Sequence, residues 1–150
     1  MEVTKVPKQA ILGEAEEFSL EGVHVLLAED NDLNAEIAVL QLEKRGMVVK
    51  RVENGQEAVE TFANQPAGSF DVILMDIMMP LMNGYEATKA IRSLENRPDG
   101  AEIPIIAMTA NAFAEDVEAA HAAGMDAHLS KPIDMKEVLQ TLRRCLQNQK

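Results

Sequence analysis

A chain of 150 residues, 47% hydrophobic and 26% charged, has the length and composition of one globular domain with its own core. Its formal net charge of −11 disfavours binding to nucleic acid, because affinity for a polyanion depends on Lys and Arg neutralising phosphates. No apolar run approaches the roughly 20 residues needed to cross a bilayer, and the single Cys145 is compatible with a reducing compartment. We therefore expect a cytoplasmic chain that neither binds nucleic acid nor inserts into a membrane.

Short apolar runs alternate with helical patterns over residues 22–150, which we take as the domain, whereas residues 1–21 are predicted to be a linker or N-terminal extension. The alternation predicts an α/β fold with a doubly wound, five-stranded parallel sheet and helices on both faces. It does not separate one doubly wound strand order from another. Strands are predicted at 23–28, 47–52, 70–76, 103–108 and 127–129, helices at 32–44, 56–64, 84–94, 112–123 and 135–146, and a loop at 95–102.

The stretch F-D-V-I-L-M-D-I-M-M-P, residues 70–80, is predicted to contain the central strand. Its apolar run fits a strand buried on both faces, and Pro80 requires that the strand has ended, because proline cannot donate to a sheet ladder. Asp76 therefore stands at the carboxyl end of a central strand. Open α/β sheets bind their ligands at that edge.

Polar residues follow the other predicted strands at the same edge. Glu29 and Asp30 follow the first strand, Thr109 the fourth and Lys131 the fifth. Each could have an ordinary role by itself, since an Asp or Thr often caps a helix and a Lys is often a surface residue. In the strand order 2-1-3-4-5, however, strands one and three are neighbours, and three carboxylates would then meet.

Such a cluster requires protons or a cation, because two like charges about 4 Å apart repel by ~4 kcal/mol at an effective dielectric of 20. Carboxylate oxygens suit a hard divalent ion such as Mg²⁺, which shares its remaining positions with water and phosphate. Lys131 and Thr109 suit an incoming anion. The set indicates a metal ion and a phosphoryl group, with Asp76 as the nucleophile that forms an aspartyl-phosphate.

These residues lie in motifs that resemble the receiver domain of two-component signalling over roughly residues 22–146. The resemblance implies the flavodoxin-like receiver fold with strand order 2-1-3-4-5. The motifs are L-L-A-E-D-N at 26–31, E-N-G-Q-E-A at 53–58, L-M-D-I-M-M-P-L-M-N-G at 74–84, P-I-I-A-M-T-A-N-A at 104–112 and G-M-D-A-H-L-S-K-P-I at 124–133.

The resemblance also implies the roles of the site residues. Asp76 would be the phosphoacceptor, and Asp30 and Asp76 would bind Mg²⁺ directly. Glu29 would act through water, and the backbone carbonyl of Met78 would complete the protein ligands. The implied phosphoryl-binding and switch residues are Thr109, Lys131, Ala110 and His128, and the Lys131–Pro132 bond is expected to be cis.

Four positions matter in relation to the family pattern. Asn83 stands in a turn where relatives often carry Asp. Met78 and Asn111 flank the implied phosphoryl group, so their identity leaves the lifetime of the phosphorylated state open. His128 replaces a Tyr or Phe that rotates on phosphorylation, and it is either a weak switch residue or a histidine at a strand end.

The resulting hypothesis is a phosphoryl-accepting switch, a phosphoacceptor rather than an enzyme. A histidine kinase or a histidine phosphotransfer protein would donate to Asp76. The residues of these motifs are most similar to those in the receivers of hybrid sensor histidine kinases. Any histidine kinase activity would then reside in an upstream part that is missing from this chain, and the chain would be the cytoplasmic part of a membrane-bound or other kinase. The sequence shows no helical hairpin with a donor His and no output domain, which disfavours a DNA-binding transcription factor.

Three alternatives stay open on the residues alone. A metal-dependent phosphatase would form the same aspartyl-phosphate, but it needs a second acid at the position of Met78. A flavodoxin-like protein would need a phosphate cradle where this chain has Glu29 and Asp30, which repel phosphate unless metal is bound. A degenerate receiver would bind partners without being phosphorylated.

Overall fold

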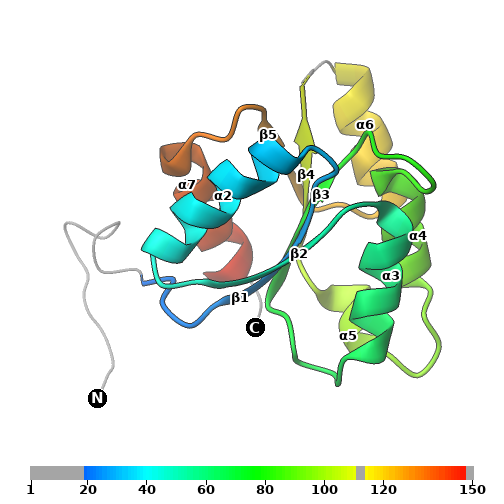
Figure 1. Cartoon of the computed structure of the whole chain (residues 1–150). Coiled ribbons are helices and arrows are strands. Elements are labelled where there is room, and N and C mark those ends of the chain that lie inside the picture. The colour runs from blue at the N-terminus through cyan, green and yellow to red at the C-terminus, as the bar shows by residue number, and fades with distance from the viewer. Residues whose placement is uncertain (1–18, 111–113, 148–150) are drawn as a thin grey trace.

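The sheet lies at the centre of the molecule with helices on both faces (Figure 1). The computed structural model describes residues 19–110 and 114–147. Its five strands pair in parallel in the order β2-β1-β3-β4-β5. The elements are β1 (His24–Ala28), α2 (Asp32–Lys44), β2 (Val48–Val52), α3 (Gly55–Asn64), β3 (Val72–Asp76), α4 (Gly84–Arg92), α5 (Pro98–Glu102), β4 (Ile105–Thr109), α6 (Ala114–Ala123), β5 (Ala127–Ser130) and α7 (Met135–Gln147).

The predicted fold class and the strand order 2-1-3-4-5 are confirmed. Each predicted strand and helix is present, and the helix over 32–44 has the predicted bounds. The largest differences at a strand start are two residues, since β3 begins at Val72 rather than at 70 and β4 at Ile105 rather than at 103. The first two residues of the helix predicted at 112–123, and residues 1–18 of the predicted linker, lie outside the described residues.

The predicted loop at 95–102 is wrong for its second half, which forms the short helix α5. Pro98 occupies the first turn of this helix, where its fixed φ is already helical and its missing N–H is no loss. Gly100 lies so close to α4 that an added Cβ would come 2.6 Å from the carbonyl oxygen of Ile91. Proline, aspartate and glycine are typical of turns as well as of helix starts, so the composition by itself did not distinguish the two.

Alternating side chains of the strands build two hydrophobic layers. On one face, Leu26 of β1 and Ile73 of β3 pack with Phe62 of α3 and Ile91 of α4. On the other face, residues such as Leu27 belong to the layer that includes α2 and α7. Leu20, within the predicted linker, is 3% exposed and belongs to this second layer. Among the described helices, none combines the length and apolar character needed to cross a membrane.

Arg92, the last residue of α4, joins three segments on the first face. Its guanidinium donates to the carbonyl oxygens of Gly100 (3.0 Å), Ile103 (2.7 Å) and Gly124 (2.8 and 3.0 Å). It also forms an ion pair with Asp126 at 2.9 Å. One side chain thus satisfies carbonyls that close α5 and the turn before β5.

We expect Arg92→Met to lower the free energy of unfolding by about 2–4 kcal/mol, because it leaves partly buried carbonyls without donors. Urea denaturation followed by circular dichroism measures this change. Arg144→Met is the matched control, since Arg144 is exposed on α7 and the same substitution there should cost less than about 0.5 kcal/mol. Equal losses for the two variants would contradict the role of Arg92.

Candidate functional site

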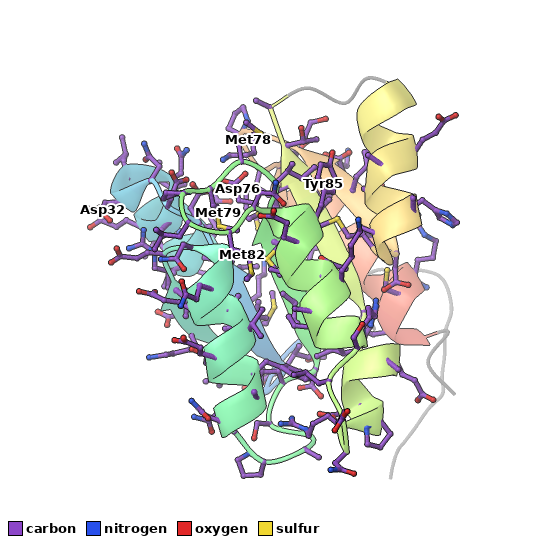
Figure 2. The ribbon with its side chains drawn as sticks, turned by 90° about the vertical axis from the view of Figure 1, so that its right-hand side faces the viewer. Asp32, Asp76, Met78, Met79, Met82 and Tyr85 are labelled. Carbon is purple, nitrogen blue, oxygen red and sulfur yellow. The ribbon has the colours of Figure 1, made fainter. Side chains whose placement is uncertain are left out.

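Three carboxylates meet at the carboxyl edge of the sheet. Glu29 and Asp30 follow β1, and Asp76 ends the neighbouring strand β3. One oxygen from each lies within 4.8 Å of the other two. Figure 2 shows Asp76 at this end of the sheet, between the labelled Met78 and Met79 of the loop that follows β3. The adjacency of β1 and β3 creates the cluster, since Asp76 is 46 or more positions from Glu29 and Asp30 in the sequence.

Asparagine, not aspartate, caps the helix that follows β1. The side chain of Asn31 accepts a hydrogen bond from the N–H of Asn34 at 2.9 Å and so begins α2. The alternative in which Asp30 only caps this helix is therefore wrong. The backbone N–H of Asn31 also donates to Glu29 Oε2 at 3.1 Å, which holds that buried carboxylate in place.

Close packing behind Asp76 fixes the position of the strand end. The first residue of α4, Gly84, approaches β3 so closely that an added Cβ would lie 2.4 Å from the Asp76 carbonyl oxygen. Its N–H donates to the carbonyl of Ile77 at 2.9 Å. Asn83, predicted to lie in a turn, is the N-cap of α4 and forms a capping box with Glu86. The loop from β3 to α4 is thereby tied down at both ends.

Lys131 reaches the cluster from the far side of β4. Its Nζ lies 3.1 Å from Asp76 Oδ2 and 3.1 Å from Glu29 Oε1. The backbone N–H of Lys131 donates to the carbonyl of Thr109 at 2.8 Å, which joins the ends of β4 and β5. The Lys131–Pro132 bond is cis. The ammonium group therefore bridges two acids that come from different strands.

Burial governs the electrostatics of Asp76. Its side chain is 5% exposed, and desolvation, reinforced by the nearby Glu29 charge, raises the pKa of Asp76 to about 6 despite Lys131. Burial lowers the pKa of Lys131, but its hydrogen bonds and attraction to Glu29 and Asp76 outweigh that effect and leave the pKa above its ordinary value. The site thus holds a charged lysine beside a carboxylate that is costly to ionise without further positive charge.

The remaining predicted residues lie around this cluster. Thr109 ends β4 and is 8% exposed, and the next residue, Ala110, is exposed. Met78 lies two residues beyond Asp76 and is 77% exposed. His128 is exposed on β5. Asn111 lies outside the described residues. Their roles therefore stay predictions.

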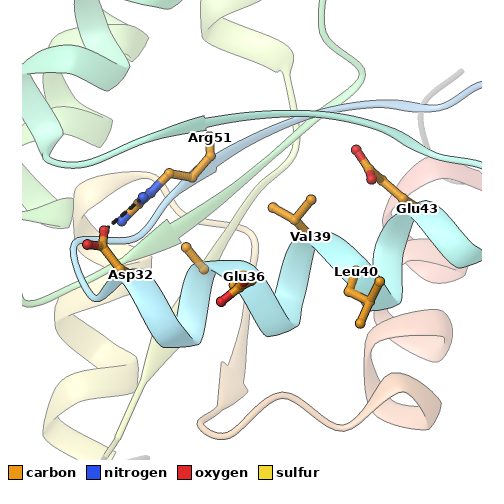
Figure 3. Close-up of a pocket in the computed structure, with 7 residues that line it drawn as sticks. Asp32, Glu36, Val39, Leu40, Glu43 and Arg51 are labelled. Atoms are coloured by element: carbon orange, nitrogen blue, oxygen red, sulfur yellow. Dashed lines mark ion pairs between the residues drawn. The ribbon is translucent and has the colours of Figure 1, made fainter.

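Sequence reasoning missed Arg51 of β2. Its guanidinium donates to the backbone carbonyl of Glu29 and forms an ion pair with Asp32 at 3.1 Å. No local pattern marks this residue, because it touches the site only after β2 pairs with β1. Arg51 and Asp32 also border a groove between α2 and β2, of about 500 Å³, whose other lining residues include Val39 and Leu40 (Figure 3).

The donor set fits a hard divalent cation. Three carboxylates with oxygens this close suit Mg²⁺, which binds oxygen ligands in an octahedral arrangement and keeps several waters. Two of the three, Glu29 and Asp76, are buried, whereas Asp30 is exposed to solvent. The fold and the site together define a doubly wound α/β protein with an acidic, cation-suited centre at its switch point.

The comparison with protein families agrees with the fold and the acidic site described above. The model of the response regulator receiver domain matches residues 25–143, and the chain therefore belongs to this family. Probable histidine kinase 1 of Oryza sativa subsp. indica is 37% identical over 151 residues, which cover 82% of this chain and 15% of that protein. The chain spans only 13–15% of the length of the first curated relatives that it matches.

Solved structures show the same likeness. The receiver domain of sensor histidine kinase PA1611 from Pseudomonas aeruginosa PAO1, with a magnesium ion coordinated in its active site cleft, is 37% identical with a TM-score of 0.75 and covers 85% of this chain and 99% of that one. The co-crystal structure of the Saccharomyces cerevisiae phosphotransfer protein Ypd1 with the receiver domain of Ssk1 matches at 28% identity and a TM-score of 0.72, covering 85% and 92%.

We expect Asp76→Asn to stabilise the metal-free protein at pH 7.5 by about 1–3 kcal/mol. Because the folded-state pKa of about 6 exceeds the ordinary 3.8, the folded state binds the proton more tightly. The stability of the unmodified protein therefore falls as the pH rises from 3.8 to about 6 and stays low at higher pH. Asparagine carries no charge and so removes the free-energy cost of a buried, ionised Asp76. At pH 5, the stabilisation by Asp76→Asn should be about half of its value at pH 7.5.

Urea denaturation in the presence of a chelator measures both effects. Asp71→Asn is the control, because this exposed aspartate lies at the opposite edge of the sheet, where its carboxylate accepts from the N–H of His24. It should bring no stabilisation. A stability unchanged or lowered by Asp76→Asn at pH 7.5 would contradict the electrostatic description of the site.

Proposed function

We propose that this chain is a phosphoryl-accepting signalling switch in which Asp76 takes the phosphoryl group from a phosphohistidine of a partner protein. The observation that carries the proposal is one buried carboxylate, paired at 3.1 Å with Lys131 and set among two further acids. A lone acid at a strand end would have no such partners. Membership of the receiver family supports the same role.

The chemistry is a transfer of phosphorus between two nucleophiles. An Asp76 carboxylate oxygen attacks the phosphorus, the bond from phosphorus to the imidazole nitrogen breaks, and the histidine leaves with its electron pair. With a pKa of about 6, Asp76 is mostly ionised above neutral pH and ready to attack. The product is an acyl phosphate, which water later hydrolyses to restore the carboxylate.

The surrounding residues stabilise the transferred charge. Lys131, held by two carboxylates in the resting site, supplies an ammonium group to a phosphoryl oxygen. Glu29, Asp30, Asp76 and the backbone carbonyl of Met78 would hold Mg²⁺. The bound ion offsets the negative charge of the acids and of the phosphoryl oxygens.

The switch itself would involve the end of β4. The Thr109 hydroxyl donates to a phosphoryl oxygen, and Ala110 moves with it. His128 on the neighbouring strand β5 reports the change at the surface. The negative charge that phosphorylation adds can shift the equilibrium between two conformations of the surface near the end of β4.

A histidine kinase or a histidine phosphotransfer protein is the proposed donor, acting in the cytoplasm, and the chain would be the receiver part of a hybrid sensor histidine kinase. Its similarity to a histidine kinase and to a receiver crystallised with a phosphotransfer protein supports both partners. The chain itself is a phosphoacceptor and not an enzyme with turnover on outside substrates. Met78 supports this view, because a phosphatase of the aspartyl-phosphate type needs an acid there.

The test is incubation with Mg²⁺ and acetyl phosphate, followed by mass spectrometry of the intact chain. We expect a gain of one phosphoryl group that is absent in Asp76→Asn and in samples with excess chelator. Lys131→Met should keep Asp76 available but slow the reaction by about tenfold or more, because one charge on the phosphoryl group is then uncompensated.

Asp71→Asn is again the matched control and should be phosphorylated like the unmodified chain. Phosphorylation that persists in Asp76→Asn would refute the assignment of the acceptor. Continuous release of phosphate from unrelated phosphate monoesters would favour a phosphatase instead.

A further inference from the structure

The side chain of Arg51 extends from β2 toward the turn that presents the acids. Figure 3 shows it reaching over to the start of α2, where it meets Asp32. Nε and Nη2 of the guanidinium both donate to the backbone carbonyl oxygen of Glu29, at 2.9 and 2.7 Å. Its side chain is 23% exposed, so most of the group is shielded from water.

Hydrogen bonds hold Glu29 at each end of the residue. Its N–H donates to the carbonyl of Val52 at 3.1 Å. Its side-chain oxygens accept from Lys131 and from the N–H of Asn31. Among the contacts described, only Arg51 donates hydrogen bonds to the carbonyl oxygen of Glu29. That carbonyl belongs to the peptide group that links Glu29 to Asp30. The direction in which Asp30 leaves the strand therefore depends on it.

The bonds to the carbonyl outweigh the ion pair with Asp32. The Asp32 side chain is 89% exposed, and ion pairs as exposed as this one contribute little to stability. Hydrogen bonds from a charged donor to a shielded carbonyl are stronger and shorter than neutral ones. The planar guanidinium presents two N–H groups to one oxygen, which a lysine ammonium cannot do with the same orientation.

We propose that Arg51 is a positioning residue of the metal site: by clamping the peptide between Glu29 and Asp30, it sets both carboxylates in the geometry that a divalent cation requires. This inference rests on the proposed function. Mg²⁺ demands near-ideal octahedral geometry, so a small rotation of this peptide lowers affinity. Groups behind metal ligands commonly change affinity by about 10–100-fold.

The charge of Arg51 acts against this role, because a cation near the site repels Mg²⁺. A substitution that removes the charge would therefore mix two opposite effects. Arg51→Lys separates them, since it keeps the charge and the ion pair with Asp32 but loses the paired donation to one oxygen. Lys50→Arg is the matched control, a charge-neutral exchange at the exposed neighbour on the same strand.

The experiment is a titration of the full chain with MgCl₂, followed by amide NMR spectra. We expect the dissociation constant for Mg²⁺ to rise about tenfold in Arg51→Lys and to stay within about twofold in Lys50→Arg. In the metal-free protein, hydrogen exchange at the Asn31 amide should quicken in Arg51→Lys. Exchange at Leu74, in the fully buried β3, should not change.

An unchanged dissociation constant in Arg51→Lys would overturn the proposal. Equal acceleration at Asn31 and Leu74 would also overturn it, because it would show general destabilisation rather than loss of a local clamp. If the unmodified chain shows no response to MgCl₂, the proposed function fails, and the metal-free exchange of Asn31 still decides whether Arg51 holds the turn.

Discussion

Repulsion between acids at the end of the sheet is the constraint on which the site depends. At 4.8 Å, two unit charges repel by about 3–4 kcal/mol at an effective dielectric of 20, and burial of Glu29 and Asp76 adds a desolvation cost. Lys131 offsets part of this by bridging both acids. The remaining imbalance appears as the raised pKa of Asp76, and it is the reason that a cation and a phosphoryl group together suit this site.

The rest of the fold keeps the acids from moving apart. A carboxylate cluster in a flexible loop would relieve its repulsion by separating. Here β1 and β3 are hydrogen-bonded neighbours, Gly84 lets α4 pack against the end of β3, and Arg51 and Asn31 hold the turn after β1. The core on both faces of the sheet thus maintains an arrangement that is unfavourable by itself, and the binding of positive charge can recover that free energy.

The elements were predictable because their signals are local. A fully apolar run such as 72–75 indicates a buried strand, and glycine or asparagine marks where helices begin and end. The error at 98–102 also has a local cause, since Pro98 and Gly100 suit both a turn and a first helical turn. The packing of Gly100 against Ile91 of α4 favours the helix over the turn, and the residues next to Pro98 in the sequence do not indicate this packing.

By itself, the sequence determined the fold class, the elements other than α5 and the residue types that follow each strand, because hydrophobic periodicity and the residues at strand ends are local properties of the sequence. Only the tertiary structure decided that Asn31 rather than an aspartate caps α2, that Lys131 bridges two acids, and that Arg51 reaches the Glu29 carbonyl. These contacts join residues brought together by strand pairing, and their distances and pKa values depend on burial that no local pattern encodes.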